Sequence, residues 1–224
     1  MNFSKAFLAI LLSCFISTPV WAGKCQQAPL PKINIVMTSK QVQYDFSRSK
    51  RELKGFNIDT KSPYDSNAHT EVGGLMNGEI SVNSQVSFGY LQDTNSGQAC
   101  YWYDTIDVKM HIDPTILIAK EHAKGTCEHS AILEHEMKHI YTDREIVKKY
   151  VPIIQSALSK AVVDIGIGGP KDMRDQARYQ KQINDYIARE VKNINPKLNT
   201  ERRQRQQAID SRQEYDRVAA MCKN

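Results

Sequence analysis

Two histidines stand four residues apart in the stretch HEMKH, residues 135–139, with a glutamate directly after the first. On an α-helix, residues four apart differ by about 40° in azimuth and one turn in rise. The imidazoles of His135 and His139 would therefore project side by side and could bind one Zn²⁺ ion. Glu136, on the edge of the same face, could take a proton from the attacking water and pass it to the leaving amine. The spacing predicts zinc-dependent hydrolysis of a peptide bond; the alternative is a solvated, charged helix face.

A catalytic zinc site needs a third protein ligand, and the sequence offers several acidic candidates. Glu145, ten residues after the first histidine, would lie about 15 Å along a continuous helix and could not reach the ion. Asp143 lies one turn beyond the second histidine and suits a supporting role behind the ligands. Glu190 is the best geometric candidate, because a chain reversal at residues 166–170 would return an antiparallel helix towards the histidines. Further acidic options are Asp210, Glu214 and Asp216.

A long helix must carry the two histidines, and apolar residues recur at helical spacing from about residue 127 to residue 165. Pro152 is expected to kink or restart this helix, and the stretch GIGGP at residues 166–170 to end it. Two more helices, mostly polar, are predicted over residues 171–194 and 200–221, divided at Asn195-Pro196. Tyr141 or Tyr215 could donate to the oxyanion that develops during hydrolysis.

Alternation of apolar and polar residues predicts strands before the long helix. Residues 30–45 indicate one or two strands. Residues 79–91 and 99–113 indicate an antiparallel pair, joined by turn residues at 93–97 and ended by Asp113-Pro114.

Between these strand groups, Ser47 is expected to cap a short helix that carries Leu53 and Phe56, and residues 57–78 are expected to form a loop. The predicted fold class is α+β. A small antiparallel sheet packs on the long helix that bears the histidines, as in zincins, and a C-terminal helical hairpin follows.

The beginning of the chain has the composition of a secretory signal, with Lys5 before a short apolar stretch and small residues near Ala22. We expect residues 1–22 to be this signal, residues 23–165 to form the zincin-like domain, and residues 166–224 to form a helical extension that packs on it. Cleavage would leave no transmembrane anchor. The expected location is the periplasm or the exterior of a Gram-negative-type cell.

Four cysteines remain after the predicted signal, an even number in an exported chain, which predicts two disulfides. The preferred pairs are Cys100–Cys127 and Cys25–Cys222. The formal net charge of +5 is spread along the chain apart from a local cluster at Arg202, Arg203 and Arg205. Exported proteins rarely meet nucleic acid, so no nucleic-acid partner is expected.

The order of these parts resembles a bacterial family of predicted secreted zinc-dependent proteases, a domain of unknown function. The stretches that carry the resemblance are CYWYDTIDVKMHI, CEHSAILEHEMKHI and AIDSRQEYDRV. It runs over most of the chain after the signal and implies a zincin-type metallopeptidase, with His135 and His139 as zinc ligands and Glu136 as base. Tyr215-Asp216 match a Tyr-Asp of that family, whereas Met221-Cys222 stand where it has His-Gly.

A peptide or protein substrate is the partner that this interpretation implies, and the sequence leaves the oligomeric state open. A second interpretation is a non-catalytic periplasmic binding module, in which the polar helices over residues 171–221 present a surface to a partner and any metal is structural or vestigial. A closed site with four protein ligands would favour it. A third is a zinc-dependent hydrolase of cell-wall amide bonds.

Overall fold

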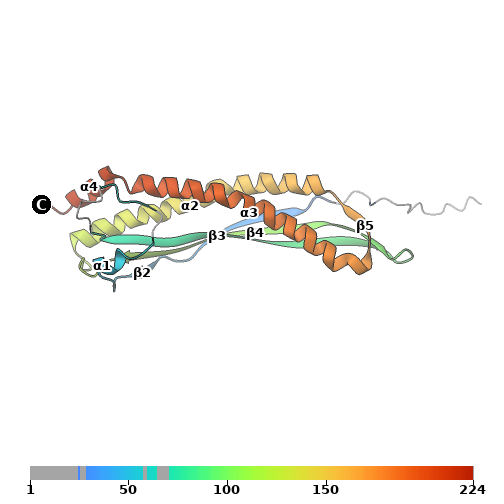
Figure 1. The fold of residues 1–224 in the computed structure, drawn as a ribbon, viewed down its shortest axis with the longest axis horizontal. Helices are drawn as coiled ribbons and strands as arrows, with labels where there is room; N and C mark the ends of the chain where they lie inside the picture. Colours follow the sequence, from blue (N-terminus) through green and yellow to red (C-terminus); the bar gives the residue numbers. More distant parts are fainter. Residues whose placement is uncertain (1–24, 26–28, 58–59, 65–70, 224) are drawn as a thin grey trace, which may run out of the picture.

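The computed structural model describes residues 25, 29–57, 60–64 and 71–223. In this part of the chain a five-stranded sheet lies against two long helices, which cover one of its faces (Figure 1). The molecule is elongated along the direction of its strands and helices. The predicted combination of a sheet, a long helix and further helices towards the C-terminus is confirmed.

The sheet is built on one long hairpin. Strands β3 (Gly74–Asp93) and β4 (Gln98–Ile118) pair antiparallel along almost their whole length. Strand β4 is central, because β1 (Lys32–Ser39), β2 (Gln43–Asp45) and β5 (Gly168–Asp172) also pair with it. Strands β1 and β2 run parallel to β4, so the sheet is mixed rather than purely antiparallel.

Strand β4 continues through Asp113-Pro114, where the sequence predicted its end. Pro114 pairs with Gly78 of β3 and has no N–H to offer to a strand on its other side. On that side β1 reaches only the level of Ile112, and β2 begins at the level of Thr115. The proline therefore falls in the gap between two neighbouring strands, where the ladder needs no donor.

Helix α2 (Cys127–Ile165) is the long helix that the apolar period predicts. The Thr126 hydroxyl accepts a hydrogen bond from the His129 N–H at its start. Gly166 ends the helix as expected, at a φ of 62° that favours glycine. Pro152 lies inside α2 without ending it, so the expected restart was wrong.

Helix α3 (Gln176–Ile209) follows the 3-10 turn η1 (Met173–Asp175) and runs back along α2 in the opposite direction. Lys149 of α2, for example, forms an ion pair with Glu201 of α3 at 2.7 Å. Helix α3 passes through Pro196 without a break, so the predicted division at Asn195-Pro196 was wrong.

The helical break lies instead at Asp210-Ser211. Helix α4 (Arg212–Ala220) begins there, and the Ser211 hydroxyl accepts from the Glu214 N–H as its cap. Asp210 is the residue that closes α3 and therefore stands on a bend between two helices. This bend lies over the first half of α2 (Figure 1).

The largest apolar core among the described residues lies between the sheet and the helices, and strands and helices contribute to it alike. Its buried members include Ile106, Val108 and Met110 of β4, Ile146, Ile154 and Leu158 of α2, and Ile183, Ile187 and Val191 of α3. Helix α3 therefore supplies part of the core itself.

Truncating a core side chain of α3 should destabilise this fold. Ile187 has no exposed surface, so Ile187→Ala is expected to lower the free energy of unfolding by about 2–5 kcal/mol. Val163→Ala, at a position on α2 that is 69% exposed, is the matched control and should change it by less than about 0.5 kcal/mol. Urea unfolding followed by circular dichroism measures both. Equal losses in the two variants would contradict a core that includes α3.

The short helix α1 (Lys50–Leu53) is present, but its cap is Ser49 rather than Ser47. Ser49 and Glu52 form a capping box, in which each side chain accepts from the other residue's backbone N–H. The loop predicted for residues 57–78 ends earlier, because β3 already begins at Gly74. This earlier start brings the beginning of β3 alongside α2.

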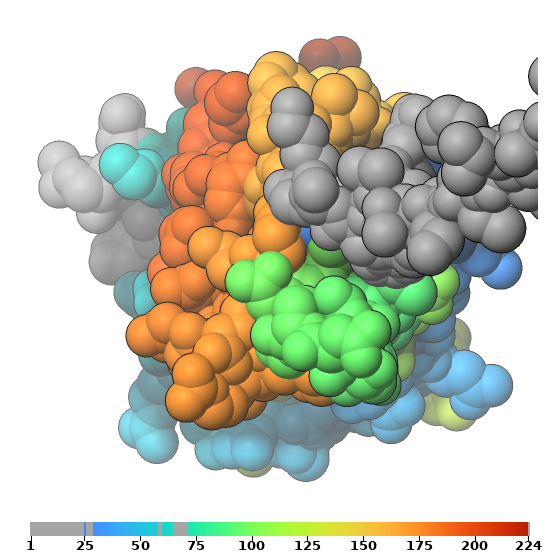
Figure 2. All heavy atoms as spheres, turned by 90° about the vertical axis from the view of Figure 1, so that its right-hand side faces the viewer, coloured from blue at the N-terminus to red at the C-terminus, as the bar shows by residue number. Residues whose placement is uncertain are grey.

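Two disulfides, Cys25–Cys100 and Cys127–Cys222, hold opposite ends of the molecule. Cys100 lies near the turn of the hairpin, at the end that faces the viewer in Figure 2, whereas Cys127 follows the other end of β4. The 21 residues of β4 separate these ends by roughly 65–70 Å. All four cysteines are bonded as predicted, but the preferred pairs Cys100–Cys127 and Cys25–Cys222 were wrong, because no disulfide can span that distance.

None of the helices in the described ranges is long and apolar enough to cross a membrane. The predicted signal at residues 1–22 lies outside the described residues.

Candidate metal centre

The three motif residues of α2 are buried and face the same space. His135, Glu136 and His139 are 4–6% exposed, and one potential ligand atom from each lies within 4.8 Å of the others. They form a group that could hold a metal ion. The alternative of a solvated, charged helix face was therefore wrong.

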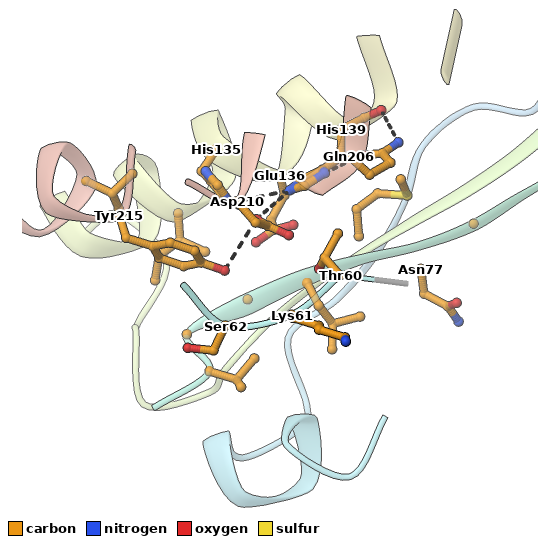
Figure 3. A pocket seen from close by; sticks show the side chains of 18 of the residues that line it. Thr60, Lys61, Ser62, Asn77, His135, Glu136, His139, Gln206, Asp210 and Tyr215 are labelled. Atoms are coloured by element: carbon orange, nitrogen blue, oxygen red, sulfur yellow. Dashed lines mark hydrogen bonds and ion pairs between the residues drawn. The ribbon is translucent and has the colours of Figure 1, made fainter. Parts of the chain in front are cut away.

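Asp210 adds a carboxylate oxygen to the two imidazoles (Figure 3). Its Oδ1 lies 3.1 Å from the Nε2 of His135 and 3.2 Å from the Nε2 of His139, and the two Nε2 atoms are 3.4 Å apart. Ligand atoms at about 2.0–2.2 Å from a tetrahedral zinc ion stand roughly 3.3–3.5 Å from one another. The observed triangle is close to that size, so these three atoms fit a single tetrahedral ion.

Two hydroxyl groups position the Asp210 carboxylate. The Tyr215 hydroxyl donates to Oδ1 at 3.3 Å, and the Thr60 hydroxyl donates to the same carboxyl group. The Tyr215 ring also contacts the His135 ring, with centroids 5.5 Å apart. Although burial opposes its charge, the hydrogen bonds that the two histidines donate while their Nε2 atoms carry protons hold the pKa of Asp210 well below its usual range. Asp210 is therefore ionised, as a metal ligand must be.

Each histidine has a different partner on its Nδ1 atom. The Nδ1 of His135 lies 3.4 Å from Glu214, whose carboxylate also accepts from Lys138 and Arg217. The Arg217 guanidinium above all lowers the pKa of Glu214 to about 2, against a smaller opposing effect of burial. A charged Glu214 favours the tautomer with the proton on Nδ1, which leaves the Nε2 lone pair of His135 directed at the site.

The second histidine is held by an amide. The Nδ1 of His139 donates to the Oε1 of Gln206, and the Nε2 of Gln206 donates in turn to the His139 carbonyl at 3.1 Å and to Asp143 at 2.7 Å. Asp143 has no exposed surface and pairs with Arg202 at 2.8 and 3.1 Å. Arg202 also donates to the Gly78 carbonyl at 2.9 Å. This network joins the motif helix to α3 and β3.

Glu136 lies against the start of β3. The Met76 N–H donates to its carboxylate, and its Oε1 would stand 3.2 Å from a β-carbon at Gly74. Any side chain at Gly74 would also meet Ile132 at 2.4 Å, so only glycine fits there. Burial raises the pKa of Glu136 to about 7, although the two histidines oppose the shift. A carboxylate with a pKa near neutrality suits a general base.

The structure does not bring Glu190 to the histidines. The charge of Glu190 instead raises the pKa of Lys160, to a lesser degree than the closer Asp164 does. Lys160 follows His139 by 21 residues on the continuous α2 and thus stands about 31 Å from it along the helix axis. Glu145 is exposed, in line with its exclusion from the sequence. Asp143 has the supporting position that its spacing indicated.

Other residues of the site were either open options or missed. Asp210 and Glu214 were options without a preference, and Tyr215 lines the site whereas Tyr141 is 55% exposed. Gln206 and Thr60 were missed, because neither has a type that signals a metal site. The stretch Ser211-Arg212-Gln213-Glu214 has the spacing of a helix start, and it could have located the bend that presents Asp210.

A cleft of about 800 Å³ opens beside the motif (Figure 3). The two histidines, Glu136 and Asp210 line it from the helices, residues 71–79 line it from β3 and the segment before it, and residues 60–62 border it as well. A molecule that enters this cleft therefore reaches the buried group directly.

A scan against protein-family models finds no match for this chain, and searches among curated proteins and among solved structures find none either. The family resemblance of the sequence stays a prediction.

Proposed function

We propose that the protein is an exported zinc-dependent metallopeptidase of the zincin type. The observation that carries this proposal is the triangle formed by the Nε2 atoms of His135 and His139 and the Oδ1 of Asp210, with Glu136 buried beside it at a cleft. Two imidazoles and one carboxylate form a donor set typical of catalytic zinc, and it leaves a fourth position for water or substrate.

The side chains have separate roles in the proposed reaction. A zinc ion held by His135, His139 and Asp210 would polarise the scissile carbonyl and acidify the attacking water. Glu136 takes the proton of that water and delivers it to the leaving nitrogen, so that the amide bond breaks and a carboxylate and an amine form. Burial of Glu136 supports this role, because a raised pKa lets the carboxyl group both accept and release a proton near pH 7.

A peptide can be held at this site by backbone pairing. In the described part of the chain β3 pairs only with β4, so its other edge borders the cleft between Gly74 and Glu79. Edge strands of this kind bind extended peptides through main-chain hydrogen bonds, although on this edge the Met76 N–H and the Gly78 carbonyl already bond to Glu136 and Arg202. The two disulfides support the exported part of the proposal, periplasmic or secreted, because such bonds persist in oxidising compartments.

Metal analysis and metal removal test the proposal together. The purified protein is expected to contain about one zinc ion per chain, and treatment with a chelator such as 1,10-phenanthroline should abolish hydrolysis of an unfolded protein substrate. Addition of one equivalent of zinc should restore it. Protein without stoichiometric metal, or hydrolysis that persists after the metal is removed, would rule the proposal out.

A non-catalytic binding module remains the second candidate, and one observation favours it. The Glu136 carboxylate lies close enough to the histidines to be counted among the possible ligands, and with Asp210 it would make a closed, four-ligand structural site. Acetohydroxamate, which needs an open position on the metal, separates the two candidates. Binding to the zinc-loaded protein supports the peptidase, and absence of binding supports the closed site.

A further inference from the structure

The two ends of the cleft differ in chemistry, and the motif lies between them. On the side of His135, the cleft is bordered by the beginning of α2, by α4 and by the chain that leads into β3. On the side of His139, it is bordered by α3 and by the next residues of β3. Figure 3 shows this arrangement, with Tyr215 on one side of Glu136 and Asn77 on the other.

The end beside His135 carries most of the apolar lining, although Ser62 and Glu71 also border it. Ile132, one turn before the first histidine, lines it together with Val72 and Val218, and all three are partly exposed. Gly73 forms part of the wall, where a β-carbon would stand 2.9 Å from the Ile132 side chain. The absence of side chains at Gly73 and at the following glycine lets Ile132 lie against the strand.

The end beside His139 is polar. It is lined by Arg202, Gln206, Asn77 and Glu79. Arg202 also donates a hydrogen bond of 2.9 Å to the backbone carbonyl of Gly78. An apolar side chain placed there would take the exposed Asn77 and Glu79 side chains out of contact with water, which is costly. A polypeptide that lies across the motif therefore meets an apolar surface on one side of the site and a polar surface on the other.

We infer that the apolar end, formed by Val72, Ile132 and Val218, is a specificity pocket for an apolar side chain adjacent to the bond that is cut. The inference rests on the proposed peptidase function and adds its substrate class, which is extended polypeptide with a leucine-like or larger apolar residue on one fixed side of the cleaved bond. Binding such a residue removes apolar surface of both partners from water.

Binding of small hydroxamates tests the pocket without relying on turnover. Two probes share a hydroxamate on a short peptide scaffold and differ only in the adjacent side chain, isobutyl in one and carboxymethyl in the other. The zinc-loaded protein is expected to bind the isobutyl probe about tenfold or more tightly. Val218→Asp, which places a carboxylate in the pocket, should remove this preference, whereas Val163→Asp, at an exposed position of α2, should keep it. Calorimetry measures the affinity of each probe for the wild type and for both variants.

Cleavage-site profiling supplies the second measurement. A proteome-derived peptide mixture digested with the wild-type protein should show apolar residues enriched at one position next to the cut, and Val218→Asp should flatten that enrichment. Equal binding of the two probes, or a preference that Val218→Asp leaves intact, would overturn the pocket while the zinc content and hydrolysis support the peptidase. If the wild-type protein shows no zinc-dependent hydrolysis, the proposed function is overturned, and the pocket inference with it.

Discussion

Glu136→Gln is expected to lower kcat for peptide hydrolysis by a factor of about 10² to 10⁴ while the zinc content stays at the wild-type level. The amide has nearly the shape of the carboxylate, and its oxygen can still accept from the Met76 N–H, so the buried position keeps its packing. What the amide cannot do is take a proton from water. Steady-state kinetics and metal analysis of the same preparation measure the two quantities.

The matched control is Glu145→Gln, which makes the same chemical change on the exposed surface of α2. Its kcat and zinc content should equal those of the wild type. If Glu136→Gln hydrolyses peptides at the wild-type rate, Glu136 is not the general base. If the variant instead loses its zinc, Glu136 is a ligand and the closed, structural site gains support.

Asp210→Ala should weaken zinc binding by more than about 100-fold, because on the proposed function it removes one of three ligands, and even the loss of a residue behind a ligand costs 10- to 100-fold. Glu190→Ala, which changes the acidic residue that the sequence favoured, should leave zinc affinity unchanged. Competition with a chromogenic chelator gives both dissociation constants. Circular dichroism spectra confirm that each variant is folded.

The reverse result, with zinc lost from Glu190→Ala and kept by Asp210→Ala, would show that α3 docks differently from the structure. An equal, small effect of both variants would assign the third position to another side chain, and Glu136 is the nearest.

The motif residues could be predicted because both the chemistry and its geometry are local. His135 and His139 are four residues apart on one helix, and the apolar period identifies that helix from the sequence alone. The hairpin of β3 and β4 is equally local, since alternating residues and a turn rich in Asn, Ser and Gly specify it.

The third ligand depends on how far one helix runs before the next returns. Helix α2 extends 26 residues beyond His139 to Ile165, and the same distance along α3 from Gln176 ends near Arg202. Glu190 lies on the part of α3 before the level of the histidines, whereas Gln206 and Asp210 lie at that level. The helix was predicted to begin at residue 171, and its later start at Gln176 alone changes which residues reach the histidines by more than one turn.

Two further errors of the sequence analysis share one physical cause. Pro152 and Pro196 each remove one helical hydrogen bond; Pro152 was expected to kink or restart its helix, and Pro196 to divide two helices. Both lie in helices whose apolar faces are buried against the sheet and against each other, and this packing outweighs the local cost.

The disulfide pairs were mispredicted because the length of β4, rather than distance along the chain, decides which cysteines meet.

The bend at Asp210-Ser211 has a consequence for the order of events during maturation. Until α3 has docked along the whole of α2, the two histidines alone are a bidentate chelator, and the acidic partner is missing. The Cys127–Cys222 bond then ties α4, which carries Glu214 and Tyr215, to the start of α2. On the proposed function, the protein becomes able to hydrolyse peptides only in the last step of folding. A chain that is still being exported would therefore not cleave the proteins around it.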